Sequence, residues 1–161
     1  MANLLGLTNA PAVGVRATTR SNTGHLAIDL DVMPETVPII RTIVRAHLQL
    51  WGLHELIDPA ALTVSELLAN VLKHARPDTR SGSRNAQLTV TRLPEALNVC
   101  VRDFDPAPPK LSPVDDAEED GRGLHLVIAV ADDFGCSPVT GGKDVWANFL
   151  INNSQANLDR R

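Results

Sequence analysis

The stretch Ser-Glu-Leu-Leu-Ala-Asn-Val-Leu-Lys-His-Ala, residues 65–75, is the part of the chain from which the fold can be worked out. Its leucines and valine recur on one side of a helix, so it predicts an amphipathic helix with one buried face. Glu66, Asn70 and His74 follow one another at intervals of four and form a polar stripe beside the apolar one. An amide oxygen suits Mg²⁺ and a carboxylate one turn away can accept a proton. Taken alone, however, the stripe fits the solvated face of an ordinary helix better than a catalytic site.

The composition limits the class of protein. The chain has 161 residues, of which 43% are hydrophobic, enough for one domain with a core. No apolar run reaches the roughly 18 residues of a membrane span, and the N-terminus does not resemble an export signal, so we expect a cytoplasmic protein with no membrane partner. With 15 basic against 19 acidic residues and 3% aromatics, direct binding of nucleic acid is not expected.

Hydrophobic periodicity predicts further strands and helices on both sides of residues 65–75. The predicted elements are a strand at 25–32, helices at 35–51 and 58–75, strands at 86–92 and 96–104, a helix at 121–132, and strands at 136–140 and 144–151. This order predicts an α+β fold, a two-layer α/β sandwich in which helices cover one face of a mixed sheet. Residues 25–151 would form the domain. Residues 1–24 and 152–161 lack an apolar period and are predicted to be flexible tails.

Three more segments carry polar or glycine-rich signals. Val-Arg-Asp-Phe-Asp-Pro, residues 101–106, ends a strand with Asp103, whose carboxylate can accept a hydrogen bond from the amino group of a purine. Gly-Arg-Gly-Leu, residues 121–124, opens a helix, and backbone amides at a helix start attract phosphate. Gly-Gly-Lys, residues 141–143, predicts a hairpin turn with a solubilising lysine. Each signal is weak alone, because turns and strand ends share these residues.

The order of the four segments is more specific than any one of them. A helix with Glu-x-x-x-Asn, a strand ending in Asp, a loop, Gly-x-Gly-Leu opening a helix and a terminal hairpin together resemble the GHKL ATPase/kinase superfamily, over about residues 26–150. The strings at residues 65–75 and Gly-Arg-Gly-Leu-His-Leu-Val at 121–127 look most like the anti-sigma-factor serine kinase branch, and like small ATP-binding regulatory proteins of actinobacteria. The resemblance implies a Bergerat-type ATP-binding fold with ATP and Mg²⁺ as cofactors.

The resemblance also implies roles for individual residues. Glu66 would be the catalytic general base, and Asn70 would be the metal ligand that holds Mg²⁺ on the nucleotide phosphates. Asp103 would read the adenine amino group. His74 matches a position that lies near the phosphates, although a surface or core-edge histidine explains it nearly as well.

The glycine-rich helix start would bind the phosphates through Gly121, Arg122, Gly123 and Leu124, with residues 106–120 as the ATP lid. Two positions depart from the family pattern. Asp103 is followed by Phe-Asp-Pro-Ala where the family has x-Gly-x-Gly, which places Asp105 and Pro106 in the nucleotide-binding site. Trp146 stands where other branches place a threonine, and is expected either in the core or, as the alternative, in the adenine wall.

The function implied is that of an ATP- and Mg²⁺-dependent serine/threonine protein kinase acting as an anti-sigma factor. Its substrate would be a serine of an anti-sigma-factor antagonist, with a sigma factor as the other ligand and a homodimer as a possible assembly. The altered residues after Asp103 support an alternative, a non-catalytic ATP-binding module that sequesters a protein partner.

Overall fold

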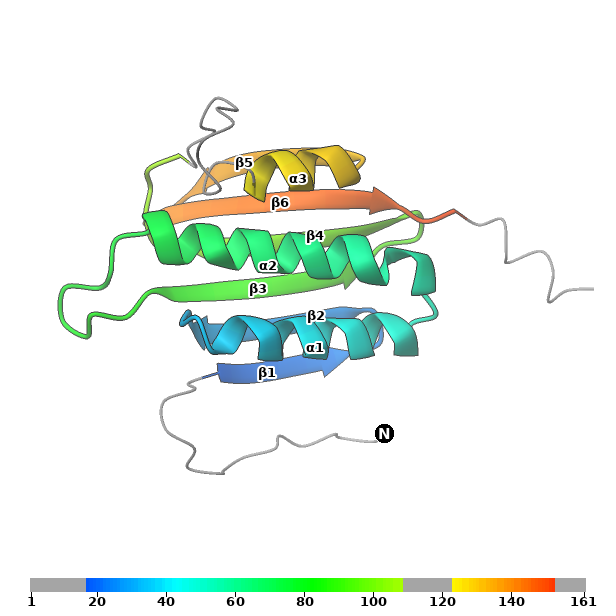
Figure 1. Cartoon of the computed structure of the whole chain (residues 1–161), viewed down its shortest axis with the longest axis horizontal. Coiled ribbons are helices and arrows are strands. Elements are labelled where there is room, and N and C mark those ends of the chain that lie inside the picture. The colour runs from blue at the N-terminus through cyan, green and yellow to red at the C-terminus, as the bar shows by residue number, and fades with distance from the viewer. Residues whose placement is uncertain (1–16, 109–122, 153–161) are drawn as a thin grey trace, which may run out of the picture.

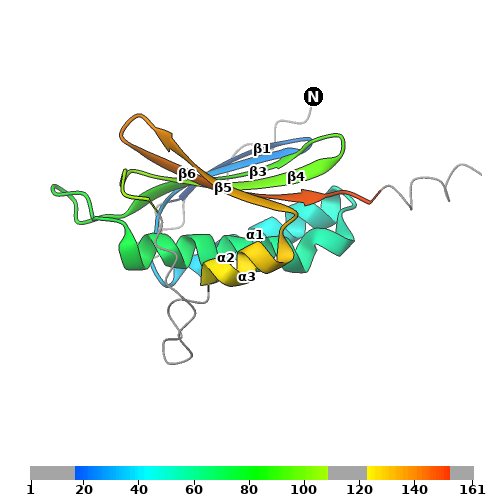
Figure 2. The same cartoon turned by 90° about the horizontal axis from the view of Figure 1, so that it is seen from above.

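The computed structural model describes residues 17–108 and 123–152. Along the chain these residues form β1 (Ala17–Asn22), β2 (His25–Asp31), α1 (Thr36–Leu50), the short 3-10 helix η1 (His54–Leu56), α2 (Ile57–His74), β3 (Asn85–Arg92), β4 (Ala96–Asp103), α3 (Gly123–Val130), β5 (Asp133–Val139) and β6 (Gly142–Leu150). The strands make one sheet, and the helices lie together on one of its faces (Figures 1 and 2). The predicted two-layer α+β sandwich is therefore confirmed.

The sheet has the strand order β1-β2-β3-β4-β6-β5, and all five pairs of neighbouring strands are antiparallel. The expectation of a mixed sheet is wrong for these strands. Two helices, α1 and α2, separate β2 from β3, so the chain enters β3 in the opposite direction. A single helix separates β4 from β5, but β6 lies between these two strands and pairs with both in antiparallel fashion.

The predicted N-terminal tail, residues 1–24, is longer than the structure allows. Residues 17–22 form β1, which pairs with β2 from Ala17 opposite Leu30 to Asn22 opposite His25. All six residues of β1 are exposed, so the strand has no buried face and leaves no alternating apolar pattern. Residues 1–16 and 153–161, the remainder of the predicted tails, lie outside the described residues.

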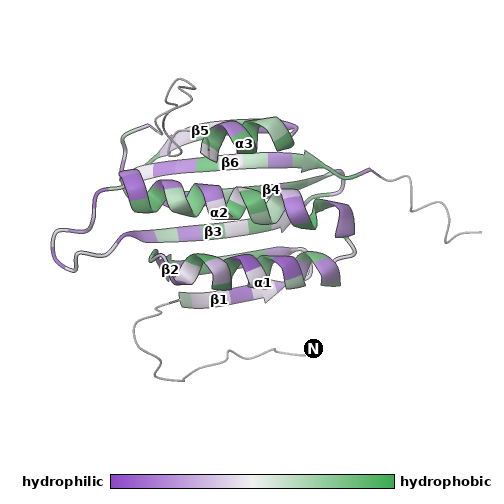
Figure 3. Cartoon of the chain, viewed as in Figure 1, coloured by the Kyte–Doolittle hydropathy of each residue, from purple (hydrophilic) through white to green (hydrophobic). Residues whose placement is uncertain are grey.

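The core lies between the sheet and the helices. Every second residue of each central strand points into it, and Figure 3 shows hydrophobic and hydrophilic residues mixed along helices and strands, as expected for elements with one buried side. The fully buried side chains with the largest volumes are Phe149, Leu26, Ile28, Ile40, Leu48, Leu67, Leu68, Leu88, Leu97, Val44, Val64 and Val90. Helix α2 is the middle helix of the layer and contacts both α1 and α3. No helix among the described residues is long and apolar enough to cross a membrane.

Candidate functional site

The polar stripe predicted on residues 65–75 lies on α2, and its members differ in burial. Glu66 and Asn70 are half-buried, whereas His74, the last residue of the helix, is exposed. Within the described part of the chain, neither Glu66 nor Asn70 makes a side-chain hydrogen bond or ion pair, and neither has a buried polar atom without a partner. Neither side chain is therefore committed to a partner among these residues, and Glu66 lines a surface pocket.

The N-terminus of α3 lies directly against Glu66. A β-carbon built at Gly123 would collide with Oε2 of Glu66, so glycine is required for this close approach. Leu124, the next residue, is buried in the core and anchors the helix. Two of the four predicted phosphate-binding residues, Gly123 and Leu124, are thus brought beside the predicted base. Gly121, Arg122 and residues 109–120 of the predicted lid lie outside the described residues.

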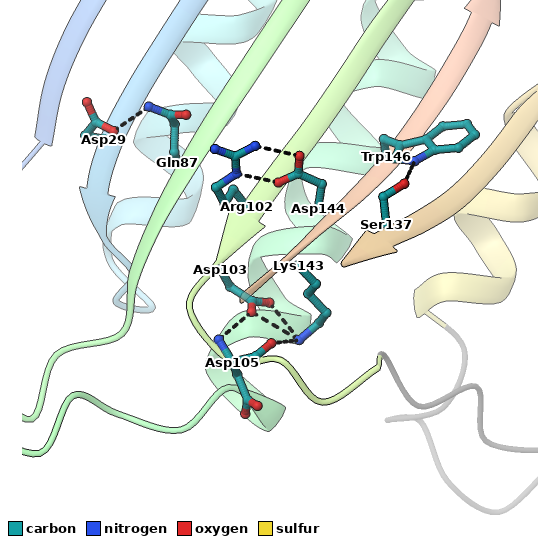
Figure 4. Close-up of polar contacts among 9 residues, drawn as sticks. All are labelled: Asp29, Gln87, Arg102, Asp103, Asp105, Ser137, Lys143, Asp144 and Trp146. Atoms are coloured by element: carbon teal, nitrogen blue, oxygen red, sulfur yellow. Dashed lines mark hydrogen bonds and ion pairs between the residues drawn. The ribbon is translucent and has the colours of Figure 1, made fainter. Parts of the chain in front are cut away.

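Asp103 lies at the end of β4, and its side chain is only 4% exposed (Figure 4). The ammonium Nζ of Lys143 lies 3.1 Å from each of its carboxylate oxygens. The expectation of a solubilising lysine at position 143 is wrong, since the Lys143 side chain is 7% exposed and points toward the helices. The predicted turn is present, with Gly141 at φ +77°, and Gly142 lets β6 pass against the backbone carbonyl of Asp103.

Asp105 organises the turn that follows β4. Its backbone N–H donates to Oδ1 of Asp103 at 2.9 Å, and its backbone oxygen accepts from Lys143 at 2.9 Å. Its own carboxylate accepts from the backbone N–H of Ala107 and that of Arg76, each at 3.0 Å. The hydrogen bond from Ala107, then that from Arg76 and the charge of Lys143, hold the pKa of Asp105 below its ordinary value.

Successive side-chain-to-backbone hydrogen bonds of this kind stabilise turns without glycine. At the two positions where the family pattern has glycine this chain has Asp105 and Ala107, and hydrogen bonds made by Asp103, Asp105 and Lys143 hold the turn instead. Pro106, which follows Asp105, is exposed and carries no contact of its own in this network. Asp103 and Asp105 lie together and both contact Lys143.

Trp146 lies neither in the core nor beside Asp103. Its neighbours Val145 and Ala147 are buried under the helices, so the indole points to the opposite, helix-free face of the sheet. There it covers Gly135 of β5, and its Nε1 donates to Oγ of Ser137 at 3.3 Å (Figure 4). Both expectations for this tryptophan are therefore corrected.

The site residues form two groups, each linked to α2. The first consists of Glu66, Asn70 and Gly123. The second consists of Asp103, Asp105 and Lys143 and is joined to the end of α2 through the backbone of residue 76. In the described part of the chain no three His, Cys, Asp or Glu side chains gather as a metal cage. The free amide oxygen of Asn70 nevertheless fits Mg²⁺ that is held mainly by phosphates and water.

A comparison with protein-family models agrees with this arrangement. Residues 30–149 match the model of the histidine kinase-like ATPase domain, which covers well over half of the chain. The chain belongs to the histidine kinase-like ATPase family. A comparison with curated protein sequences finds no match.

The match to the histidine kinase-like ATPase domain spans every site residue described above and leaves β1 outside. Membership of this family makes ATP with Mg²⁺ the expected ligand and ATP-dependent phosphotransfer the expected class of chemistry. Lys143 is the residue that sequence reasoning missed. Its position in β6 has the same parity as Val145 and Phe149, and that parity was the signal that it faces the site.

Proposed function

We propose that this histidine kinase-like ATPase domain is a serine/threonine protein kinase that uses ATP and Mg²⁺ and acts as an anti-sigma factor. Its substrate in this proposal is a serine of an anti-sigma-factor antagonist, and a sigma factor is its other ligand. The observation that carries the catalytic part is the accessible carboxylate of Glu66 against the helix start at Gly123. The strings at residues 65–75 and 121–127 support the anti-sigma part through their resemblance to that branch.

The division of roles follows from the two groups of residues. Asn70, one turn after Glu66, would hold Mg²⁺ through its amide oxygen, and the backbone at Gly123 and Leu124 would bind phosphate at the start of α3. ATP with Mg²⁺, when bound, would supply a transferable phosphoryl group and a cation that offsets its charge. Asp103 would accept a hydrogen bond from the base.

Glu66 would accept the proton of the attacking serine at a carboxylate oxygen. It has the freedom to do so, because no hydrogen bond or ion pair within residues 17–108 and 123–152 holds it. General base catalysis by one such group contributes about 10²- to 10⁴-fold to a rate.

The test is calorimetric titration of the full chain with ATP in the presence of Mg²⁺, followed by phosphate transfer to a purified anti-sigma-factor antagonist. Asn70→Ala should weaken Mg²⁺-dependent binding, and Glu66→Gln should bind ATP normally but transfer phosphate at least 100-fold more slowly. Asn98→Ala and Glu95→Gln are the matched controls. Asn98 bonds Asn148 on the helix-free face, and Glu95 is exposed in the β3–β4 turn.

No binding heat with wild-type protein would refute the nucleotide-dependent function. Unchanged transfer by Glu66→Gln would remove Glu66 as the base. ATP binding by the wild type without any transfer would leave the second candidate, an ATP-binding module that sequesters its partner without phosphorylating it. The specific observation that favours this second candidate is Asp103, whose carboxylate is paired with a buried lysine rather than left open.

The cellular setting belongs to the same proposal. A cytoplasmic location and a homodimer are expected of an anti-sigma factor of this type. Co-purification of the tagged full chain with a sigma factor or an antagonist, with and without ATP, checks the partners. Light scattering of the purified chain checks the dimer, and a single monomeric mass at working concentration would contradict it.

A further inference from the structure

A surface pocket lies between α1 and α2, beside Glu66. Its volume is about 540 Å³, which is within the usual range of pockets that bind ligands. Helix α1 contributes Arg41 and Arg45 to its lining, and α2 contributes Asp58, Ser65 and Glu66. Six of its seven lining residues are polar or charged, so the pocket suits a hydrophilic peptide better than an apolar ligand.

Glu66 borders this pocket on one side and the start of α3 on the other. Its Oε2 is the atom that a β-carbon at Gly123 would meet, whereas the pocket extends to α1. Helix α2 lies between α1 and α3 and contacts both (Figure 1). In the proposed function the phosphates lie at the start of α3, so a serine that enters through the pocket reaches Glu66 from the other side. Phosphoryl transfer needs the attacking and leaving oxygens roughly in line, and this direction of approach fits that requirement.

The charges in the pocket are not all paired. Arg45 lies 2.8 Å from the carboxylate of Asp58. Arg41, one turn earlier on α1, donates to the hydroxyl of Ser65 at 3.4 Å and makes no ion pair within residues 17–108 and 123–152. Because Ser65 directly precedes Glu66, the charge of Arg41 is beside the place where the serine would be held. A guanidinium binds a carboxylate strongly, since it can donate two parallel hydrogen bonds to it.

We infer that this pocket holds the segment of the protein partner that carries the acceptor serine, and that Arg41 selects a segment with an acidic residue close to that serine. The inference rests on the proposed function, in which the serine proton passes to Glu66. The serine oxygen then bonds to the transferred phosphorus as the bond from that phosphorus to the leaving ADP oxygen breaks. Arg41 is a specificity-determining residue, because its charge contacts the partner segment and not the reacting atoms.

The experiment measures kcat and KM for phosphate transfer from ATP, with Mg²⁺, to synthetic serine peptides by the full-length protein. Each peptide carries one aspartate within three residues of the serine, and its matched peptide carries asparagine at that position. For wild type, at least one aspartate peptide should have a KM about tenfold lower than its asparagine counterpart. Arg41→Gln should lose this difference, and Arg41→Glu should prefer a peptide with lysine there.

Arg20→Gln is the matched control. Arg20 pairs with Asp29, whose neighbours along β2 are buried under the helices, so this pair lies on the helix-free face of the sheet. The control should keep the preference of wild type for aspartate. ATP titration of Arg41→Gln should also match wild type, because Arg41 lies on the side of Glu66 away from Gly123.

Equal KM values within every pair of peptides would overturn the inference, as would a preference that survives in Arg41→Gln. A loss of ATP affinity in Arg41→Gln would place Arg41 at the nucleotide and overturn it too. A changed oligomeric mass of Arg41→Gln with an unchanged KM would make the pocket a contact between copies of the chain, which again overturns it. Transfer to the purified antagonist but to no peptide refutes this inference and leaves the proposed function standing. Transfer to neither refutes both.

Discussion

Replacing Gly123 by alanine separates the stability of the fold from the chemistry at Glu66. The added β-carbon would collide with Oε2 of Glu66, which is the end of a flexible side chain, so Glu66 can turn away while the backbone stays in place. Turning the side chain costs about 0.5–1.5 kcal/mol, and alanine gains up to about 1 kcal/mol over glycine in a helix. The free energy of unfolding should therefore change by no more than about 1.5 kcal/mol, which is a shift of about 6 °C or less in Tm.

The displaced carboxylate no longer lies where it accepts the proton of the attacking hydroxyl. Phosphate transfer should therefore fall by about 10²-fold or more while ATP binding remains. The assays are thermal unfolding, ATP titration and transfer to the antagonist, for Gly123→Ala, Glu66→Gln and the double variant. Because both changes act through one group, the double variant should be no slower than Glu66→Gln alone. Wild-type transfer by Gly123→Ala, or an additive loss in the double variant, would refute this reasoning.

Three further predictions concern Gly142, Asp105 and Cys100. Gly142→Ala places a methyl group against a backbone carbonyl that cannot turn away, so urea denaturation should show a loss of about 2–3 kcal/mol; a variant as stable as wild type would contradict the close approach. The hydrogen bond from Ala107 holds the pKa of Asp105 below 3.8, so the unfolded chain binds the proton more tightly. The stability advantage of wild type over Asp105→Asn should be full at pH 7 and shrink as the pH falls below 3.8, and a constant difference would argue against the pKa shift. Burial raises the pKa of Cys100 to about 11, so the rate of its alkylation in the folded protein should still increase above pH 9. Exposed Cys136 should react first at pH 8, and mass spectrometry distinguishes the two sites. A rate for Cys100 that levels off near pH 9 would count against its burial.

The elements with a buried face were predicted closely from the sequence. Of the two strands without a buried residue, β5 was predicted with its start displaced by three residues and β1 was missed. The helix at residues 58–75 and the strand at 96–104 appear within a residue or two as α2 and β4, because seven of the 18 residues of α2 and four of the eight of β4 are buried. The strand β1 was missed because all of its residues are exposed and only backbone pairing with β2 holds it. An alternating apolar pattern arises only where one face of a strand is buried, and β1 has no buried face.

At the candidate site, the residues on α2 were easier to predict than their partners. The spacing of Glu66 and Asn70 is a property of one helix, whereas the pairing of Asp103 with Lys143 joins residues that are 40 positions apart. A lysine after two glycines is typical of a solvated turn, and only the parity of β6 places it inside. Charge alone was misleading, because an ammonium between a carboxylate and a carbonyl is stable where an unpaired one is not.

The two groups of site residues should respond differently to the same nucleotide. Asp103, Asp105 and Lys143 are already fixed by hydrogen bonds, so a base that meets them finds a rigid surface with little ordering left to do. Glu66 and Asn70 have no partners within the described residues, so the phosphates and metal must order them on binding. In the proposed function Asp103 accepts a hydrogen bond from the base, so a preference for ATP over GTP should persist without Mg²⁺, because it depends on the fixed group. The affinity for ATP and the rate of phosphate transfer should depend strongly on Mg²⁺, because both require Glu66 and Asn70, which the metal and phosphates order on binding. Titration of ATP and GTP in the presence of a chelator measures base selectivity without the contribution of Mg²⁺. Loss of base selectivity under those conditions would mean that the two groups of residues act as one.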